Sequence, residues 1–192
     1  MPVNIPILLT WLRIAMIPLM IAVFYVPESW LHDIGRNLAA TLIFVVAAVT
    51  DWLDGYLARR WNQTSAFGAF LDPVADKLVV AAALIMLVQL GRLDAILAAI
   101  IIGREITISA LREWMAQIGA QKSIAVSMIG KIKTVAQMVA IPLLLYHSPI
   151  SGLDIQNLGT WLIYIAAVLT LWSMGYYMRM AWPHLAEQDR KR

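Results

Sequence analysis

Six apolar stretches, separated by short polar segments, constrain the fold of this 192-residue chain more than any other feature of its sequence. Hydrophobic residues make up 61% of the chain and charged residues only 14%, against about 25% in an average soluble domain. A soluble globule would leave much of this apolar surface in water. We therefore expect an all-α, polytopic membrane protein with six transmembrane helices, forming a single domain over residues 1–192. In windows of about 19 residues, hydropathy places the spans at 5–26, 38–57, 69–90, 93–110, 132–146 and 159–180.

The distribution of basic residues predicts the orientation of the chain. An even number of spans puts both termini on one side, and only Arg36 and Arg92 of the 15 Lys and Arg residues fall at the opposite side. By the positive-inside rule the side with the termini is cytoplasmic. The sequence pI of about 9.3 is thus explained by membrane topology and a phosphate pocket, and we expect no nucleic acid partner.

The start of the first span is more polar than the rest of it. Asn4, Pro6, Thr10 and Arg13 make this start amphipathic, and amphipathic helices lie in the plane of the membrane interface. We expect an N-terminal interfacial segment that runs along the cytoplasmic surface before the chain turns into the bilayer.

Two absences from the sequence narrow the chemistry. The chain has no cysteine, which excludes disulfides, thiolate catalysis and cysteine-ligated metal centres. It also has no G-x-x-x-x-G-K-[ST] motif, because Gly130 and Lys131 lack the upstream glycine. A triphosphate cradle of the P-loop type is therefore not expected.

Acidic residues lie within the second and third apolar stretches, where ionisable side chains are costly and normally face a polar cavity. Asp51 lies about 20 Å along a helix from Leu38, and Asp76 lies about 21 Å from Leu90. Both acids therefore reach a similar depth. Helical spacing also groups the acids with small residues on two stripes. The stripes consist of Asp51, Asp54, Gly55 and Ala58 on one helix and Gly68, Asp72, Ala75 and Asp76 on the next.

Four carboxylates that face each other across two helices repel unless cations lie between them. An all-oxygen site selects hard ions such as Mg²⁺ or Mn²⁺, and four acids suit two ions. Alternatively, the acids are solvated or pair with Arg59, Arg60 and Lys77, but this does not explain the small residues on the same faces. We predict a metal site formed by Asp51, Asp54, Asp72 and Asp76.

A cluster of basic residues in the second half of the chain indicates an anionic substrate. Arg104 lies inside a predicted span, where it must pair with an acid such as Glu105 or with a bound anion. Lys122 is explained by topology alone. A metal-bridged diphosphate with its acyl tail in the bilayer fits the depth and chemistry of the acids. The residues predicted to bind an anionic substrate are Arg104, Arg112, Lys131 and Lys133.

Residues 51–76 read D-x2-D-G-x2-A-R-x8-G-x3-D-x3-D, and with this motif the chain resembles the CDP-alcohol phosphotransferase family. Residues 47–77, 104–114 and 130–138 are similar to bacterial members of the inner membrane that use CDP-diacylglycerol and sn-glycerol 3-phosphate. The resemblance implies transfer of the phosphatidyl group to the 1-hydroxyl of sn-glycerol 3-phosphate, which yields phosphatidylglycerol phosphate and CMP. It also implies surrounding membrane lipids and a homodimer.

The resemblance also implies roles for individual residues. Asp51, Asp54 and Asp72 would hold two divalent ions, with Asp76 joining the second and acting as general base. The acceptor's own phosphate would bind the basic cluster. One departure is Ile7, where the family often has asparagine. The residues implied to contact CDP-diacylglycerol are Gly55, Ala58, Arg59 and Ser65, with Thr10 and Arg13 as further candidates.

Two other functions stay open at this point. A related enzyme of the same family would use another acceptor, such as inositol, inositol phosphate or serine. A six-span cation transporter would use the acids as an ion pathway. The basic cluster favours a phosphorylated acceptor, and we see no inverted repeat of the kind that favours a transporter.

Overall fold

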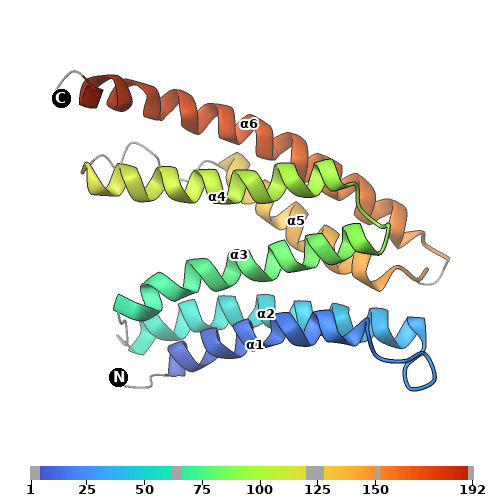
Figure 1. Ribbon diagram of the computed structural model, residues 1–192. Coiled ribbons are helices and arrows are strands. Elements are labelled where there is room, and N and C mark those ends of the chain that lie inside the picture. The colour runs from blue at the N-terminus through green and yellow to red at the C-terminus, as the bar shows by residue number, and fades with distance from the viewer. Residues whose placement is uncertain (1–4, 62–65, 120–127, 150–151, 190–192) are drawn as a thin grey trace.

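The computed structural model of the chain is a bundle of α-helices (Figure 1) and describes residues 5–61, 66–119, 128–149 and 152–189. Within these residues each predicted span overlaps one helix, with differences of up to three residues where a span exceeds its helix, and there is no strand, so the all-α prediction is confirmed. The helices alternate in direction, and α1 begins at the end of the bundle where α6 finishes (Figure 1). The helices are α1 (Ile5–Val23), α2 (Asp33–Trp61), α3 (Ala66–Gln89), α4 (Ala95–Gln117), α5 (Met128–Tyr146) and α6 (Ile155–Asp189).

Several helices extend beyond the predicted spans. Helix α2 starts at Asp33, and α4 continues to Gln117, past the last apolar residues of its span. Hydropathy detects only the apolar part of a helix, whereas backbone hydrogen bonds continue through charged residues with good helix propensity. From Ile5 onward α1 is one unbroken helix. The expected interfacial position of its polar start stays a prediction.

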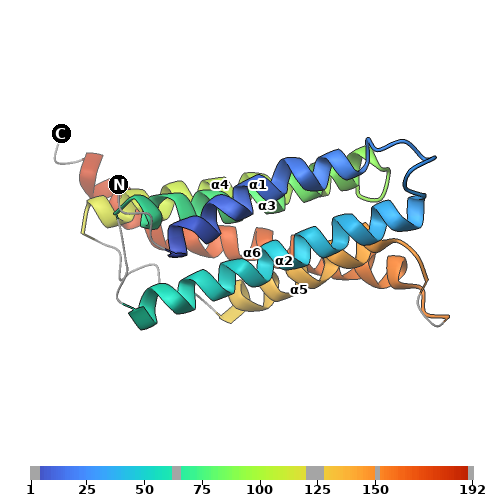
Figure 2. The ribbon, with the colours of Figure 1, turned by 90° about the horizontal axis from the view of Figure 1, so that it is seen from below.

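Helices α1, α3 and α4 lie in one layer and α2 and α5 in another, and α6 runs obliquely from beside α5 to beside α4 (Figure 2). Helix α1 packs against α2 and α3, α5 packs against α2 and α6, and α4 packs against α3 and α6. The helices converge near the loop between α1 and α2, and toward the opposite end α1, α2 and α3 diverge from α4 and α6 (Figure 1). The accessible surface of 11,810 Å² exceeds the roughly 9,100 Å² of a compact monomer of this mass, as an open bundle requires.

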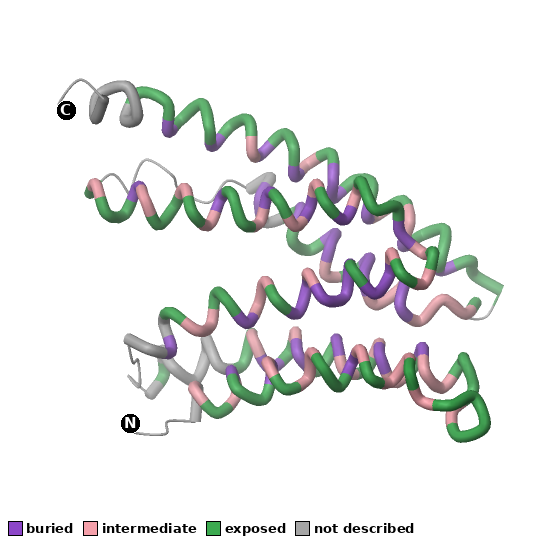
Figure 3. The backbone as a smooth tube through the Cα atoms, in the orientation of Figure 1, coloured by how far each residue is buried: buried purple, intermediate pink, exposed green. Residues whose placement is uncertain are grey.

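The apolar core lies where the helices converge, and the buried positions of α3 and α5 gather there (Figure 3). Close contact between α5 and α6 depends on Gly159, because a Cβ at this position would lie 3.0 Å from a side-chain carbon of Leu144. The converging end therefore provides the packing that holds the helices together. The side chains of this core include Phe44, Leu84, Leu87, Ile101, Ile141, Leu144 and Ile163.

Several charged or polar side chains are buried, and many large apolar side chains are exposed on the outer faces. Trp172 is 67% exposed and Arg13 only 1% exposed, and many other large apolar side chains lie on the outer faces. Monomeric soluble proteins rarely expose apolar surface on this scale. Among the described residues, two helical segments are long and apolar enough to cross a membrane, Asp33–Leu53 and Ile155–Pro183. Both findings are consistent with a membrane protein.

The two basic residues predicted on the far side have structural partners. Arg92, in the turn between α3 and α4, donates from Nη1 to the carbonyl oxygen of Leu145 at 2.7 Å and from Nη2 to Asn37 Oδ1 at 2.8 Å. It thus joins the last turn of α5 to the first turns of α2. Arg36 pairs with Asp33 of its own helix at 2.9 Å.

Arg92→Gln tests the importance of this link. We expect a loss of about 2 kcal/mol in the free energy of unfolding, because the shorter side chain leaves two α5 carbonyls and Asn37 unpaired. The measurement is denaturation of the purified protein in detergent. Arg36→Gln is the matched control and should cost no more than about 0.5 kcal/mol, as an exposed pair within one helix. Equal losses in the two variants would contradict the assignment.

Candidate active site

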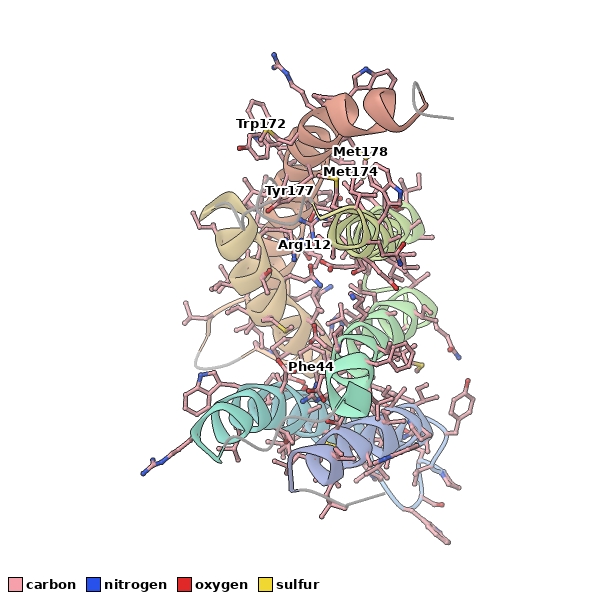
Figure 4. The ribbon with its side chains drawn as sticks, turned by 90° about the vertical axis from the view of Figure 1, so that its left-hand side faces the viewer. Phe44, Arg112, Trp172, Met174, Tyr177 and Met178 are labelled. Atoms are coloured by element: carbon pink, nitrogen blue, oxygen red, sulfur yellow. The ribbon has the colours of Figure 1, made fainter. Side chains whose placement is uncertain are left out.

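Polar side chains gather at the diverging end of the bundle. This end contains the start of α1, α3 and α5 and the last turns of α2, α4 and α6 (Figure 1). Figure 4 looks onto it and shows side chains from several helices pointing into the space between them, with Arg112 and Tyr177 between α4 and α6. The sequence-predicted acids and bases therefore occur at one end of the molecule.

The acidic half of the site is formed by α1, α2 and α3. Arg13 Nη1 lies 2.7 Å from Asp51 Oδ1, and Thr10 Oγ1 donates a hydrogen bond to Asp72 Oδ1. Thr10 and Arg13 are three residues apart, so they share one face of α1, and both are buried. Helix α1 thus connects an acid of α2 to an acid of α3.

Asp76 lies one turn beyond Asp72 on α3 and is partly buried. The charges that act on it come from Asp51, Arg13, Glu105 and Lys77. Asp76 is therefore positioned between the acidic half of the site and the fourth helix, which carries Glu105.

The structure describes only part of the predicted metal site. Side chains of Asp54, Gly55, Ala58 and Arg59, although in α2, lie outside the described ones, and Ser65 lies in the undescribed segment 62–65. Among described residues no three Asp, Glu or His side chains are close enough to hold an ion. The donor chemistry still fits a hard cation, because Asp51, Asp72 and Asp76 offer only carboxylate oxygens. The contact of Arg13 with Asp51 also shows that this carboxylate accepts a positive partner.

The basic half of the site is formed by α4, α5 and α6. Glu105 accepts from Lys133 Nζ and lies 3.4 Å from Arg104 Nη1, so one carboxylate contacts two buried cations. Arg104 Nη2 lies 3.1 Å from Ser173 Oγ. The expected pairing of Arg104 with Glu105 is therefore found, and Lys133 shares the same acid.

The other two predicted anion-binding residues are Arg112 of α4 and Lys131 of α5. The guanidinium carbon of Arg112 lies 5.5 Å from the centre of the Tyr177 ring, a cation–π contact between α4 and α6. Lys131 lies in the first turn of α5, but its side chain is outside the described ones. Arg112 thus lies at the same end as Arg104 and Lys133, and Lys131 stays a prediction.

Sequence reasoning missed the contribution of α6. Ser173 and Tyr177 contact the predicted bases, yet they lie in a helical segment that is apolar enough to cross a membrane. Thr170, Ser173 and Tyr177 recur at intervals of three and four residues and are all buried. This polar stripe at helical spacing is the signal that could have identified them.

Comparison with known proteins defines the class. The family model for CDP-alcohol phosphatidyltransferase matches residues 3–172, and the chain belongs to this family. Members of the family generally use a divalent metal. The chain is 52% identical over 190 residues to the CDP-diacylglycerol--glycerol-3-phosphate 3-phosphatidyltransferases of Shigella flexneri serotype 5b and Escherichia coli strain K12. Each match covers 98% of this chain and all of the relative.

Glu105→Gln tests the arrangement of the basic half. The change removes the negative charge that contacts both Lys133 and Arg104, and we expect it to cost about 3 kcal/mol of unfolding free energy, because the two buried cations lose this shared partner. Denaturation in detergent measures the loss. The exposed Glu113 of the same helix provides the control, and Glu113→Gln should change stability by less than about 0.5 kcal/mol.

A second variant separates charge from packing. Adding Lys133→Met to Glu105→Gln removes one of the uncompensated cations, so part of the lost stability should return. A double variant that is less stable than Glu105→Gln alone would contradict the ion-pair interpretation.

Proposed function

We propose that the chain transfers the phosphatidyl group of CDP-diacylglycerol to the 1-hydroxyl of sn-glycerol 3-phosphate, giving phosphatidylglycerol phosphate and CMP. The observation that carries the proposal is the pairing of two half-sites at one end of the bundle. Carboxylates of α2 and α3 suit a metal-bound diphosphate, and Arg104 and Lys133 suit a second phosphate group. The names of the 52% identical relatives support the same reaction and the same acceptor.

The site is proposed to open to the cytoplasm at the inner membrane of a bacterium. All six helices would cross the bilayer, since even the shortest, α1 and α5, have 19 residues and span about 28 Å of a hydrocarbon core of about 30 Å. The diphosphate of a lipid substrate lies near the membrane surface, and the diverging end carries most of the basic residues expected on the cytoplasmic side.

Asp51, Asp54, Asp72 and Asp76 are proposed to hold two divalent ions, Mg²⁺ or Mn²⁺. Bound there, the ions would neutralise the diphosphate and stabilise the leaving phosphate of CMP. Thr10 and Arg13 orient Asp72 and Asp51, which keeps the carboxylate oxygens in fixed positions. Gly55, Ala58, Arg59 and Ser65 are proposed to contact the CDP moiety, as the family motif implies.

The bond changes follow from this arrangement. The 1-hydroxyl oxygen of the acceptor attacks the β-phosphorus, which forms one P–O bond. The bond between the β-phosphorus and the bridging oxygen breaks, and this oxygen leaves with CMP. Asp76 takes the proton of the attacking hydroxyl as general base. Arg104, Arg112, Lys131 and Lys133 hold the phosphate of the acceptor and so align its hydroxyl.

The proposal is tested by CMP release from purified protein in detergent. With CDP-diacylglycerol and Mg²⁺, we expect release with sn-glycerol 3-phosphate and none with serine, inositol or inositol phosphate. A chelator should abolish the reaction, and added Mg²⁺ or Mn²⁺ should restore it. Release with a different acceptor would reassign the substrate, and the absence of release with every acceptor would refute the transferase proposal.

Asp76→Asn tests the general base. We expect turnover to fall by at least about 100-fold, because the amide cannot take the proton, while CDP-diacylglycerol binding is retained. Turnover is followed by CMP release, and binding by the thermal shift that the lipid produces. Asp33→Asn, an exposed aspartate at the opposite end of the bundle, is the matched control and should leave both unchanged. Near-normal turnover of Asp76→Asn would remove the assignment.

A further inference from the structure

Two uncharged side chains beside the basic half of the site are buried without a hydrogen-bond partner among the described residues. They are Gln137 of α5, which is 3% exposed and whose Oε1 is unpaired, and Thr170 of α6, which is 0% exposed and whose Oγ1 is unpaired. Neither residue was predicted from the sequence, and neither has a role in the reaction described above. Because a buried unpaired polar atom costs about 1–3 kcal/mol, each calls for an explanation.

The hydroxyl of Thr170 behaves unlike that of the other threonines in these helices. Thr10 donates to Asp72 in the acidic half of the site. The remaining five donate to the backbone carbonyl four residues earlier, which satisfies the hydroxyl within its own helix. These five are Thr41, Thr50, Thr107, Thr134 and Thr160. Among the described helical threonines, Thr170 is therefore the one whose hydroxyl has no hydrogen-bond partner.

Helix register places Gln137 and Thr170 next to the predicted anion-binding residues. Gly159 of α6 packs against Leu144 of α5, and the two helices run antiparallel. Eleven residues from this contact along each helix, and toward the same end of the bundle, are Thr170 on α6 and Lys133 on α5, so we infer that these two residues lie at a similar level. Gln137 lies one turn beyond Lys133, deeper in the bundle.

The same wall continues to Arg104. Ser173, one turn after Thr170, donates to the Thr170 carbonyl at 3.0 Å and lies 3.1 Å from Arg104 Nη2. The unpaired amide of Gln137 on α5 and the unpaired hydroxyl of Thr170 on α6 are thus uncharged groups on the helices that carry the basic half of the site, and we call these two side chains the α5–α6 wall.

The chemistry of this wall suits a hydroxyl group. An amide oxygen accepts one hydrogen bond from a hydroxyl, and a threonine hydroxyl donates or accepts another. A phosphate or metal ion would instead be met by charges, which lie nearer the end of the bundle. The rise of a helix over four residues is about 6 Å, so a small acceptor with its phosphate at Lys133 reaches Gln137 with its carbon chain.

We propose that Gln137 and Thr170 bind the 2-hydroxyl of the acceptor and so determine specificity for a glycerol phosphate. The inference rests on the proposed function and names the group within the acceptor that the α5–α6 wall recognises. The wall is left unpaired in the free protein and becomes satisfied when the acceptor binds. An acceptor without this hydroxyl leaves both side chains unpaired and is used poorly.

The experiment compares two acceptors with two variants. 3-Hydroxypropyl phosphate keeps the reacting hydroxyl and the phosphate of sn-glycerol 3-phosphate and lacks the 2-hydroxyl. The wild-type protein should prefer sn-glycerol 3-phosphate in kcat/KM by about 10- to 100-fold. Gln137→Leu and Thr170→Val should each lose activity on sn-glycerol 3-phosphate alone, so that the preference falls to less than a third of its wild-type value. Thr160→Val, on the same helix as Thr170 and partly buried away from the site, should keep the full preference.

A structural role would give different results. If Gln137→Leu and Thr170→Val lowered activity on both acceptors equally, or left the wild-type preference intact, the inference would be overturned. Stability provides a second readout, because replacing an unpaired buried amide with leucine should leave the melting temperature of the ligand-free protein unchanged or raise it. A lower melting temperature of Gln137→Leu would show that the amide serves the fold. No CMP release from the wild type with sn-glycerol 3-phosphate would refute the proposed function itself.

Discussion

An ionised side chain is costly in a low-dielectric interior unless it is paired, and the rest of this structure depends on how that requirement is met. Arg13 is buried on α1 and contacts Asp51 of α2, while Lys133 of α5 contacts Glu105 of α4. At the other end, Arg92 is bound by α5 carbonyls and by Asn37 of α2. Each of these contacts joins two helices, so the pairing of buried charges also sets how the helices lie against each other.

Apolar packing and polar contacts lie toward opposite ends of the bundle. The apolar core lies where the helices converge, and side chains such as Phe44 and Leu144 supply hydrophobic contact there. Toward the diverging end the contacts between α1, α2 and α3 and those between α4, α5 and α6 become polar. Rigid helices anchored at one end can hold charged groups in fixed positions at the other, which is what a preorganised site requires.

The candidate acids and bases could be predicted because each is recognisable from its near neighbours in the sequence. An acid within an apolar stretch, such as Asp51 or Asp76, is conspicuous against its neighbours, and the pairing of Arg104 with Glu105 follows from their adjacency. The contacts of Thr10 and Arg13 could not be read in this way. Thr10 is 62 residues from Asp72 in sequence, and no local pattern specifies which helix α1 will face. Their proposed contacts with CDP-diacylglycerol remain a prediction.

By itself, the sequence determined the helical class, the approximate helix positions and the acidic motif, because hydrophobic periodicity and residue spacing act within one helix or between neighbours. Only the tertiary structure decided that α1 connects Asp51 to Asp72, that Glu105 is shared by Arg104 and Lys133, and that Gln137 and Thr170 lie unpaired beside them. These features depend on which faces of distant helices meet. That choice is made by packing and by the pairing of buried charges over the whole chain, and no single segment contains it.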